Sequence, residues 1–314
     1  MVPAVSARKL GGRDFLDVAD LDPTELRGVL DLGHRIKAGR WAEHPLKGRH
    51  IAMLFQKPSH RTRVSFEVGI ARLGGTTTTL TEQDVQIGVR ETVGDAARVL
   101  DRYVDGIVAR LRTHDDLMEL AAAAEKPVIN ALTDRSHPCQ ILADLMTLEE
   151  LRGPLAEQEL VYIGDGNNIV TSLIEASALL DFPLKVIVPP GYEPKAAVLE
   201  RAGHLSTRKL KVTFSNDPRD LDGATAVYTD VWTSMGQEGE REARRKAFAG
   251  YQVNTALMDA APNAVFLHCL PAHRGEEVTD AVIDGPRSAV FDQAANRLYA
   301  QMALMAELFG DGQW

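Results

Sequence analysis

Short apolar runs alternate with helical stretches along the chain, and this alternation constrains the fold more than any other feature. In the first half, strands are predicted at 50–55, 77–80, 106–109 and 128–130, and helices at 23–38, 65–73, 92–103 and 115–124. Strands that alternate with helices in this way are typical of a parallel sheet covered by helices. The first half is therefore predicted to form one α/β domain.

The same pattern starts again after Gly153 and Pro154. Strands are predicted at 160–163, 184–188, 212–214, 226–229 and 265–268, and a final helix with a mostly apolar face at 295–309. A longer amphipathic helix, 137–151, is predicted just before the break. A chain of 314 residues usually forms two domains of about 150 residues each. A second α/β domain is therefore expected. The charged run 238–246 is interpreted either as the solvated face of a helix or as a functional lid.

Composition argues against several kinds of partner. The chain has 35 Lys and Arg against 44 Asp and Glu, a net charge of -9, so it lacks the basic surface that binds nucleic acid. No stretch is long and apolar enough for a membrane span, and the first residues lack the apolar core of a secretory signal. The two cysteines, Cys139 and Cys269, match neither a disulfide framework nor a paired zinc site. A cytoplasmic protein that binds neither nucleic acid nor membrane is expected.

A polar cluster lies between the strand 50–55 and the helix that follows it. It contains Ser59, His60, Arg61, Thr62 and Arg63. Free amide groups and the dipole at a helix N-terminus favour an anion, and arginine adds paired hydrogen bonds, so the cluster suits a phosphate group. The alternative is that these residues only cap the helix.

Further polar groups follow other predicted strands or open helices. His137 and Gln140 could polarise a carbonyl oxygen. The turn 164–168 follows a strand, but it lacks the third glycine of a dinucleotide fingerprint, so a nucleotide cofactor is not expected. Asp230 suits an ammonium group, whereas a lone cysteine that follows an apolar strand, such as Cys269, is usually an inert core residue.

Together these motifs resemble, in order and over most of the chain, the signatures of the aspartate and ornithine carbamoyltransferase family. The matching segments are Ser59–Arg63, His137–Gln140, Gly164–Asn168, Asp230–Glu238, His268–Pro271 and Asn296–Arg297. The resemblance implies an α/β fold with two doubly wound parallel-sheet domains of similar size, joined by two interdomain helices. It implies a carbamoyl phosphate-binding domain (1–136), an interdomain helix (137–152), an ornithine-binding domain (153–290) and a C-terminal helix that packs back on the N-terminal domain (291–314).

The resemblance also assigns site residues. It implies that Arg61, His137, Asp230 and Cys269 are catalytic. Carbamoyl phosphate would be bound by Ser59, His60 through its backbone, Arg61, Thr62, Gln86 from a neighbouring subunit, Arg110, His137, Pro138, Cys139, Gln140, Cys269, Leu270 and Arg297. Ornithine would be bound by Asn168, Asp230, Ser234 and Met235. No metal or organic cofactor is implied, and the family resemblance implies a homotrimer or a multiple of trimers.

The acceptor is indicated by the loop that contains Ser234, Met235 and Gly236, which resembles the loop of the ornithine-specific members. The implied reaction is transfer of the carbamoyl group from carbamoyl phosphate to the δ-amine of L-ornithine, giving L-citrulline and phosphate for arginine biosynthesis. One alternative is another acceptor, such as putrescine. A second is a catalytically silent homologue, because His60 and Ala295 depart from the family pattern.

Overall fold

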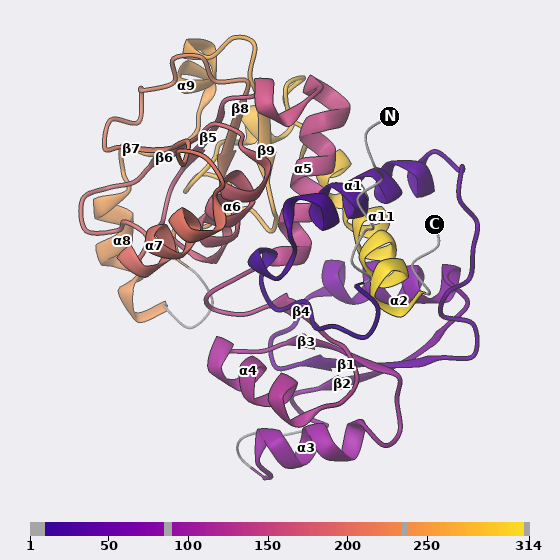
Figure 1. Ribbon diagram of the computed structural model, residues 1–314. Helices are drawn as coiled ribbons and strands as arrows, with labels where there is room; N and C mark the ends of the chain where they lie inside the picture. The colour runs from indigo at the N-terminus through magenta and orange to yellow at the C-terminus, as the bar shows by residue number, and fades with distance from the viewer. Residues whose placement is uncertain (1–9, 85–89, 234–237, 311–314) are drawn as a thin grey trace. The chain divides into compact units, whose positions relative to one another are not determined.

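The computed structural model describes residues 10–84, 90–233 and 238–310 (Figure 1). These residues form two compact units. The first takes the described residues of Met1–Ala143 and Arg297–Trp314, and the second takes those of Asp144–Asn296. The chain passes from one unit to the other within helix α5 (Pro138–Arg152) and again within helix α11 (Val290–Phe309). The domain boundaries at 136, 152 and 290 remain predictions.

The first unit is built on a parallel sheet with the strand order β2-β1-β3-β4. Its strands are β1 (His50–Phe55), β2 (Thr76–Thr81), β3 (Gly106–Arg110) and β4 (Val128–Leu132). Its helices are the short η1 (Val18–Asp20), α1 (Pro23–Lys37), α2 (His60–Arg72), α3 (Val93–Leu100) and α4 (His114–Ala123), and the N-terminal part of α5 and the C-terminal part of α11 complete it. Phe15 forms a parallel bridge with Ile129, which extends the pairing beyond β4.

The second unit is built on a parallel sheet with the strand order β7-β6-β5-β8-β9. Its strands are β5 (Leu160–Ile163), β6 (Leu184–Ile187), β7 (Val212–Ser215), β8 (Ala226–Thr229) and β9 (Val265–His268). Its helices are η2 (Leu155–Glu157), α6 (Asn168–Leu180), α7 (Ala196–Leu205), η3 (Glu238–Glu240), α8 (Arg241–Ala247), α9 (Thr255–Ala260) and α10 (Asp280–Ile283). Its core gathers around buried side chains that include Val161, Trp232, Phe248 and Phe266.

The predicted α/β class with two parallel sheets is confirmed. Two helices begin five positions before their predicted starts. Helix α2 begins at His60 because Ser59 caps it, its side chain accepting a hydrogen bond from the amide of Thr62, and α11 begins at Val290. None of the helices in the described part of the chain has the length and apolar character needed to span a membrane.

The C-terminal half of α11 packs against the first unit, as predicted. A Cβ atom added at Gly69 of α2 would lie 3.2 Å from the Cγ of Met302 and 3.3 Å from the Cε of Met305. At Gly106 in β3, a Cβ atom would lie 2.4 Å from the Phe309 ring. Glycine is therefore required at Gly106 by the close approach of this ring.

We expect Gly106→Ala to destabilise the protein by about 1–3 kcal/mol, because the added methyl group must displace the buried Phe309 ring. Urea unfolding of the purified variant measures this change. The matched control is Gly28→Ala on an exposed position of α1, where nothing lies within 4 Å of the added atom. The control should be neutral or slightly stabilising, since alanine favours a helix over glycine by about 0.5–1 kcal/mol. Equal destabilisation of both variants would contradict the packing argument.

Candidate functional site

In the first unit, three predicted site segments follow strands that are neighbours in the sheet. Ser59 lies beyond β1, Arg110 ends β3, and His137 lies beyond β4. The chain order reverses between β1 and β3, which are adjacent in the sheet. Open α/β sheets bind their ligands at the carboxyl ends of the strands beside such a reversal. The sheet topology therefore gathers these segments at one edge.

The N-terminus of α2 is arranged as an anion site. Ser59 is its N-cap, and its Oγ accepts a hydrogen bond from the Thr62 amide (3.3 Å) and donates one to Thr62 Oγ1 (3.0 Å). His60 is exposed in the first turn, and its Nε2 lies 3.5 Å from Nη1 of Arg61. Arg63 is different, because it pairs with Glu67 on the helix surface. The second arginine of the motif is therefore engaged on the helix surface, and the ligand role of the first, Arg61, remains a prediction.

His137 shows that positive charge gathers at this edge of the sheet. The side chain is buried, and its pKa lies well below the usual value, first because of burial and then because of the guanidinium groups of Arg297, Arg110 and Arg61. Three predicted phosphate or carbonyl ligands are thus close enough to act on one imidazole. The neutral imidazole can donate one hydrogen bond to a carbonyl oxygen without adding a charge.

We expect the His137 ring to stay neutral between pH 6 and 8. Its ring carbon resonance in NMR spectra, assigned with a His137→Gln variant, should not titrate in this range. A histidine whose pKa is lowered on folding stabilises the fold above about pH 6.5, and this contribution is lost as the pH falls. A titration midpoint near pH 6.5 would contradict the buried, electropositive environment.

Arg297 is held in place by three side chains. Its Nη1 donates to Gln140 Oε1 (2.7 Å), and its Nη2 lies 3.3 Å from Thr62 Oγ1. The amide of Gln301 is oriented by its neighbours so that its oxygen accepts from Nη2 (2.9 Å) and Nε (3.0 Å) of Arg297. Arg297 is therefore held by hydrogen bonds even though Ala295 departs from the family pattern.

Three further residues of the predicted donor site are Cys139, Pro138 and Gln86. Cys139 is fully buried, donates to the carbonyl of Asn130 (3.3 Å), and has its pKa raised to about 12 by burial, so it stays a thiol. Pro138 begins α5 beside His137. Gln86 lies outside the described residues. Contact of these three residues with carbamoyl phosphate remains a prediction.

In the second unit, the predicted acceptor residues follow three adjacent strands. Asn168 begins α6 after β5, Asp230 follows β8, and Cys269 follows β9. Thr229 pairs in register with Ile163 on one side and with His268 on the other. The turn 164–168 requires glycine at Gly166, where an added Cβ would lie 2.5 Å from backbone atoms.

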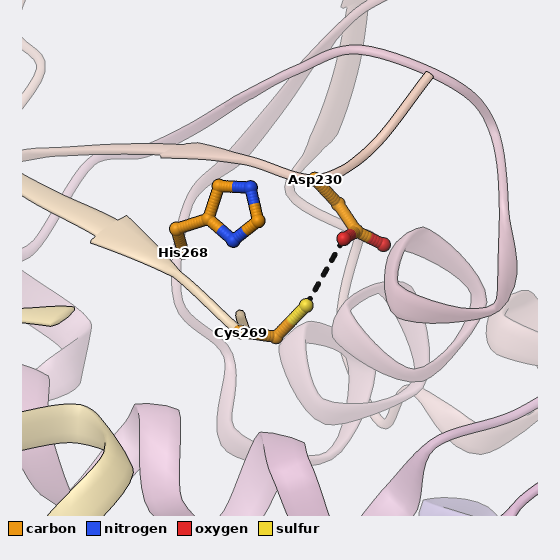
Figure 2. A group of neighbouring side chains, drawn as sticks. All are labelled: Asp230, His268 and Cys269. Carbon is orange, nitrogen blue, oxygen red and sulfur yellow. Dashed lines mark hydrogen bonds between the residues drawn. The ribbon is translucent and has the colours of Figure 1, made fainter. Parts of the chain in front are cut away.

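Asp230 is the centre of this group (Figure 2). The Cys269 thiol donates to its Oδ1 (3.0 Å), and the Asn167 amide donates to its Oδ2 (2.7 Å). Asn167 also caps α6 by accepting hydrogen bonds from the amides of Ile169 and Val170. Asn168 is the predicted substrate contact of this turn, and Asn167 was not predicted as a partner of Asp230. The position of Asn167 just before the helix, where N-caps are common, was the available signal.

His268 fixes the turn that carries Cys269. The Leu270 amide donates to its Nδ1 (2.9 Å), which places the ring proton on Nε2, 3.1 Å from Glu277 Oε1. Asp230, His268 and Cys269 are close enough to one another to be considered as metal ligands. A metal on His268 would have to break one of these two ring contacts. The described geometry therefore supports a hydrogen-bonded role for His268.

One residue of the charged run 238–246, Arg244, is not part of a solvated helix face. Most of that run is exposed, but Arg244 is buried and pairs with Asp165 (2.9 Å) and Glu240 (3.0 Å). It also donates to the carbonyl of Trp232 and lies over the Tyr192 ring, 5.2 Å from its centroid. Burial raises the pKa of Asp165 to about 6, although Arg244 opposes the shift. Arg244 thus links the 164–168 turn to the backbone after β8.

Ser234 and Met235, predicted to bind ornithine, lie outside the described residues. Their roles and those of Asn168, Asp230, Cys269 and Leu270 remain predictions. Chemically, the first unit presents cations and a neutral imidazole, which suit a phosphate and a polarised carbonyl. The second presents a carboxylate that accepts hydrogen bonds from a thiol and an amide, which suits an ammonium group.

Two family models match this chain. Residues 13–150 match the carbamoyl-P binding domain of aspartate/ornithine carbamoyltransferase, and residues 156–308 match its Asp/Orn binding domain. Among curated proteins, the ornithine carbamoyltransferase of Symbiobacterium thermophilum is 50% identical over 303 residues, covering 94% of this chain and 97% of that protein. The ornithine carbamoyltransferase of Mesorhizobium japonicum is 50% identical over 307 residues, covering 95% of this chain and 99% of that protein.

Solved structures agree with these matches. An ornithine carbamoyltransferase from Pyrococcus furiosus has a TM-score of 0.92 and 47% identity, covering 97% of this chain and 99% of that one. An anabolic ornithine carbamoyltransferase from Campylobacter jejuni has a TM-score of 0.88 and 33% identity, covering 94% of this chain and 98% of that one. The chain belongs to the aspartate/ornithine carbamoyltransferase family.

Proposed function

We propose that this enzyme is an ornithine carbamoyltransferase, which transfers the carbamoyl group of carbamoyl phosphate to the δ-amine of L-ornithine and releases L-citrulline and phosphate. The observation that carries the proposal is the position of Arg297, which donates to Gln140 (2.7 Å) and lies 3.3 Å from Thr62 Oγ1, so that it joins the segment of His137 and Gln140 to the N-terminus of α2. The curated relatives that cover nearly the whole chain bear the same activity in their names.

The donor is bound by the first unit. Phosphate is held by the N-terminus of α2 through Ser59, Arg61, Thr62 and the backbone of His60, with Arg110 as a second guanidinium group. His137, Gln140 and Arg297 hold the carbonyl oxygen. As the amine attacks, negative charge grows on that oxygen, and the fixed donors stabilise it without having to reorganise.

The acceptor is bound by the second unit. The Asp230 carboxylate receives the α-ammonium of ornithine, with Asn168, Ser234 and Met235 as further contacts. The Cys269 thiol, which already donates to Asp230, orients the reacting end of the acceptor. The neutral δ-amine forms a bond to the carbonyl carbon, the carbon–oxygen bond to phosphate breaks, and phosphate takes up the proton that the amine releases.

Finer features belong to the same proposal. The enzyme works as a homotrimer or a multiple of trimers, with Gln86 reaching the site of a neighbouring subunit, and it acts in the cytoplasm in arginine biosynthesis. It uses no metal or organic cofactor. Its domains are divided at 136, 152 and 290. Sedimentation of the purified protein measures the assembly, and a monomer with full activity would contradict the trimer.

Comparison of acceptors tests the assignment of ornithine. The purified protein should form a carbamoylated product from carbamoyl phosphate with ornithine, with kcat/KM about 10⁴-fold higher than with putrescine, because putrescine leaves a polar site unpaired. N-acetylornithine and aspartate serve as further acceptors. Activity confined to putrescine would keep the donor site but overturn the acceptor, and no product with any amine would support a catalytically silent homologue.

A further inference from the structure

The turn that leads from β4 to His137 is closed by its own hydrogen bonds. The Thr133 amide donates to the Ser136 carbonyl (2.9 Å), and the Ser136 amide donates to Thr133 Oγ1 (3.3 Å). Both residues are fully buried. The Gln140 amide donates to the His137 carbonyl (3.0 Å), so the turn continues directly into α5. The position of this turn therefore sets the positions of His137 and Gln140.

The first residue of α4, His114, holds the turn on one side. His114 lies just beyond β3, with its Nδ1 3.0 Å from Thr133 Oγ1, and its amide donates to Asp134 Oδ1 (2.8 Å). Burial lowers the pKa of His114, while Asp17, Asp134 and Asp20 oppose the shift and Arg135 adds to it. The segment that follows Arg110 is thus tied to the segment that precedes His137.

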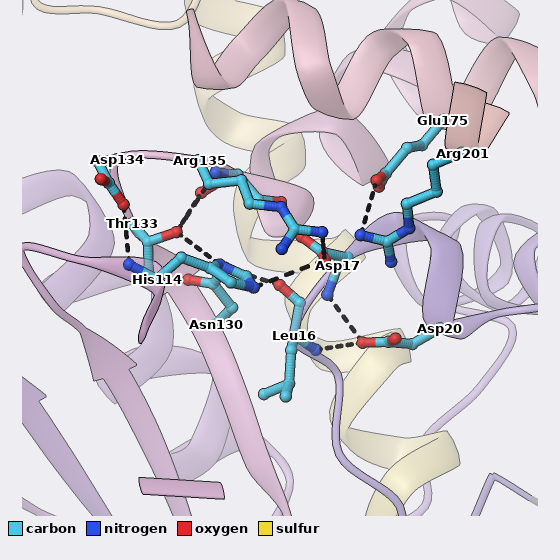
Figure 3. Close-up of polar contacts among 11 residues, drawn as sticks. Leu16, Asp17, Asp20, His114, Asn130, Thr133, Asp134, Arg135, Glu175 and Arg201 are labelled. Atoms are coloured by element: carbon cyan, nitrogen blue, oxygen red, sulfur yellow. Dashed lines mark hydrogen bonds and ion pairs between the residues drawn. The ribbon is translucent and has the colours of Figure 1, made fainter. Parts of the chain in front are cut away.

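A carboxylate from the N-terminal segment holds the turn on the other side (Figure 3). Arg135 Nη2 donates to Asp17 Oδ2 (3.0 Å), and the same oxygen lies 3.6 Å from His114 Nε2. The side chain of Asp17 is only 5% exposed, so the pair with Arg135 is shielded from water on the carboxylate side. Asp17 therefore contacts both residues that fix the turn.

The N-terminal segment is itself anchored to β4. The Phe15 amide donates to the Val128 carbonyl (2.9 Å), and the Asn130 side chain donates to the Leu16 carbonyl (2.7 Å). Asp20 Oδ2 accepts from the amides of Leu16 (2.7 Å) and Asp17 (2.8 Å). These hydrogen bonds hold the backbone around Asp17 independently of its contacts with the turn.

We propose that Asp17 is a positioning residue for carbamoyl phosphate, acting through Arg135 and His114 on the turn that carries His137 and Gln140. The inference rests on the proposed function, because it assigns these last two residues to the donor. Buried polar networks of this kind hold one geometry, and loss of one member leaves the others without a partner. A small displacement of a group that orients substrate can cost about 10²-fold in rate.

Asp17→Asn and Arg135→Gln test this, singly and together. Each single variant should raise the KM for carbamoyl phosphate by about tenfold and lower kcat, with the KM for ornithine changed by less than about twofold. The double variant should be no worse than Asp17→Asn alone, since Arg135 acts on the turn through its contact with Asp17. The His137 ring resonances should shift in all three, and Arg135→Lys should restore part of the loss.

The matched control is Asp101→Asn. Asp101 Oδ1 accepts from the amides of Glu125 and Lys126 (2.8 Å each), at the opposite end of β4 from the turn. This variant should lower Tm without changing either KM. An Asp17→Asn enzyme that behaves like the control, less stable but with a normal KM for carbamoyl phosphate and unshifted His137 resonances, would overturn the proposal. Absence of citrulline from the unmodified enzyme would instead overturn the proposed function, and the His137 resonances would still decide whether Asp17 positions the ring.

Discussion

Replacement of Arg61 by alanine is expected to lower kcat/KM for carbamoyl phosphate by about 10²- to 10³-fold. Arg61 lies in the first turn of α2, where the helix N-terminus already favours an anion. Its charge contributes to lowering the pKa of the buried His137 ring. Its loss removes a guanidinium group that binds the phosphate and stabilises the charge that develops during transfer. Initial rates of citrulline formation at varied carbamoyl phosphate measure the effect.

Arg63→Ala is the matched control, because it removes the same side chain from the same helix. Arg63 is half exposed and pairs with Glu67, a carboxylate that also accepts a hydrogen bond from Thr79. An exposed pair of this kind is worth about 0–1 kcal/mol of stability. Because Arg63 is not among the predicted substrate-binding residues, kcat/KM should change by less than about twofold. Near-normal turnover by Arg61→Ala, or equal losses in the two variants, would show that Arg61 does not bind carbamoyl phosphate.

Asp230→Asn is expected to lower kcat/KM for ornithine by about 10²- to 10³-fold while leaving the KM for carbamoyl phosphate nearly unchanged. The substitution keeps the shape of the side chain but removes the charge that would pair with the α-ammonium. It also places an amide group against the donors of Cys269 and Asn167, which now meet a weaker acceptor. Steady-state rates with each substrate varied in turn measure the change.

The choice of acceptor separates this role from a general loss of structure. If Asp230 reads the α-ammonium, the variant should lose activity with ornithine and show a much smaller preference for ornithine over putrescine, which has no α-amino-acid group. Asp220→Asn, which removes a carboxylate paired with Lys185 away from Cys269, is the control and should leave the preference unchanged. An unchanged preference in Asp230→Asn would mean that another group reads the α-ammonium.

Most strands of the two sheets could be predicted because they are short, buried apolar runs bounded by turn residues; β2, which is mostly threonine, and β7 are less buried. Strands β1, β5, β8 and β9 have the predicted bounds. The start of α2 could not be predicted, since its first turn is polar and shows no apolar periodicity. That turn is helical because Ser59 caps it, a local hydrogen bond that apolar periodicity does not reveal.

Most predicted site residues fall in short motifs at or just after the ends of strands, and parallel sheet topology brings such segments to one edge; Arg297, within α11, is an exception. Their partners could not be predicted, because they are distant in sequence. Arg135 and Asp17 are 118 positions apart, and Asn167 and Asp230 are 63 apart. The burial of Arg244 could not be predicted from the charged run, because it depends on the packing of α8.

The measurement that tests the central claim most directly follows the carbon atom that is transferred. The purified enzyme is mixed with carbonyl-labelled [13C]carbamoyl phosphate and L-ornithine, and the products are followed by 13C and 31P NMR. We expect the label in the ureido carbon of L-citrulline, with one phosphate released for each citrulline formed. Label that appears only in the products of carbamoyl phosphate breakdown, at the rate seen without enzyme, would contradict the account.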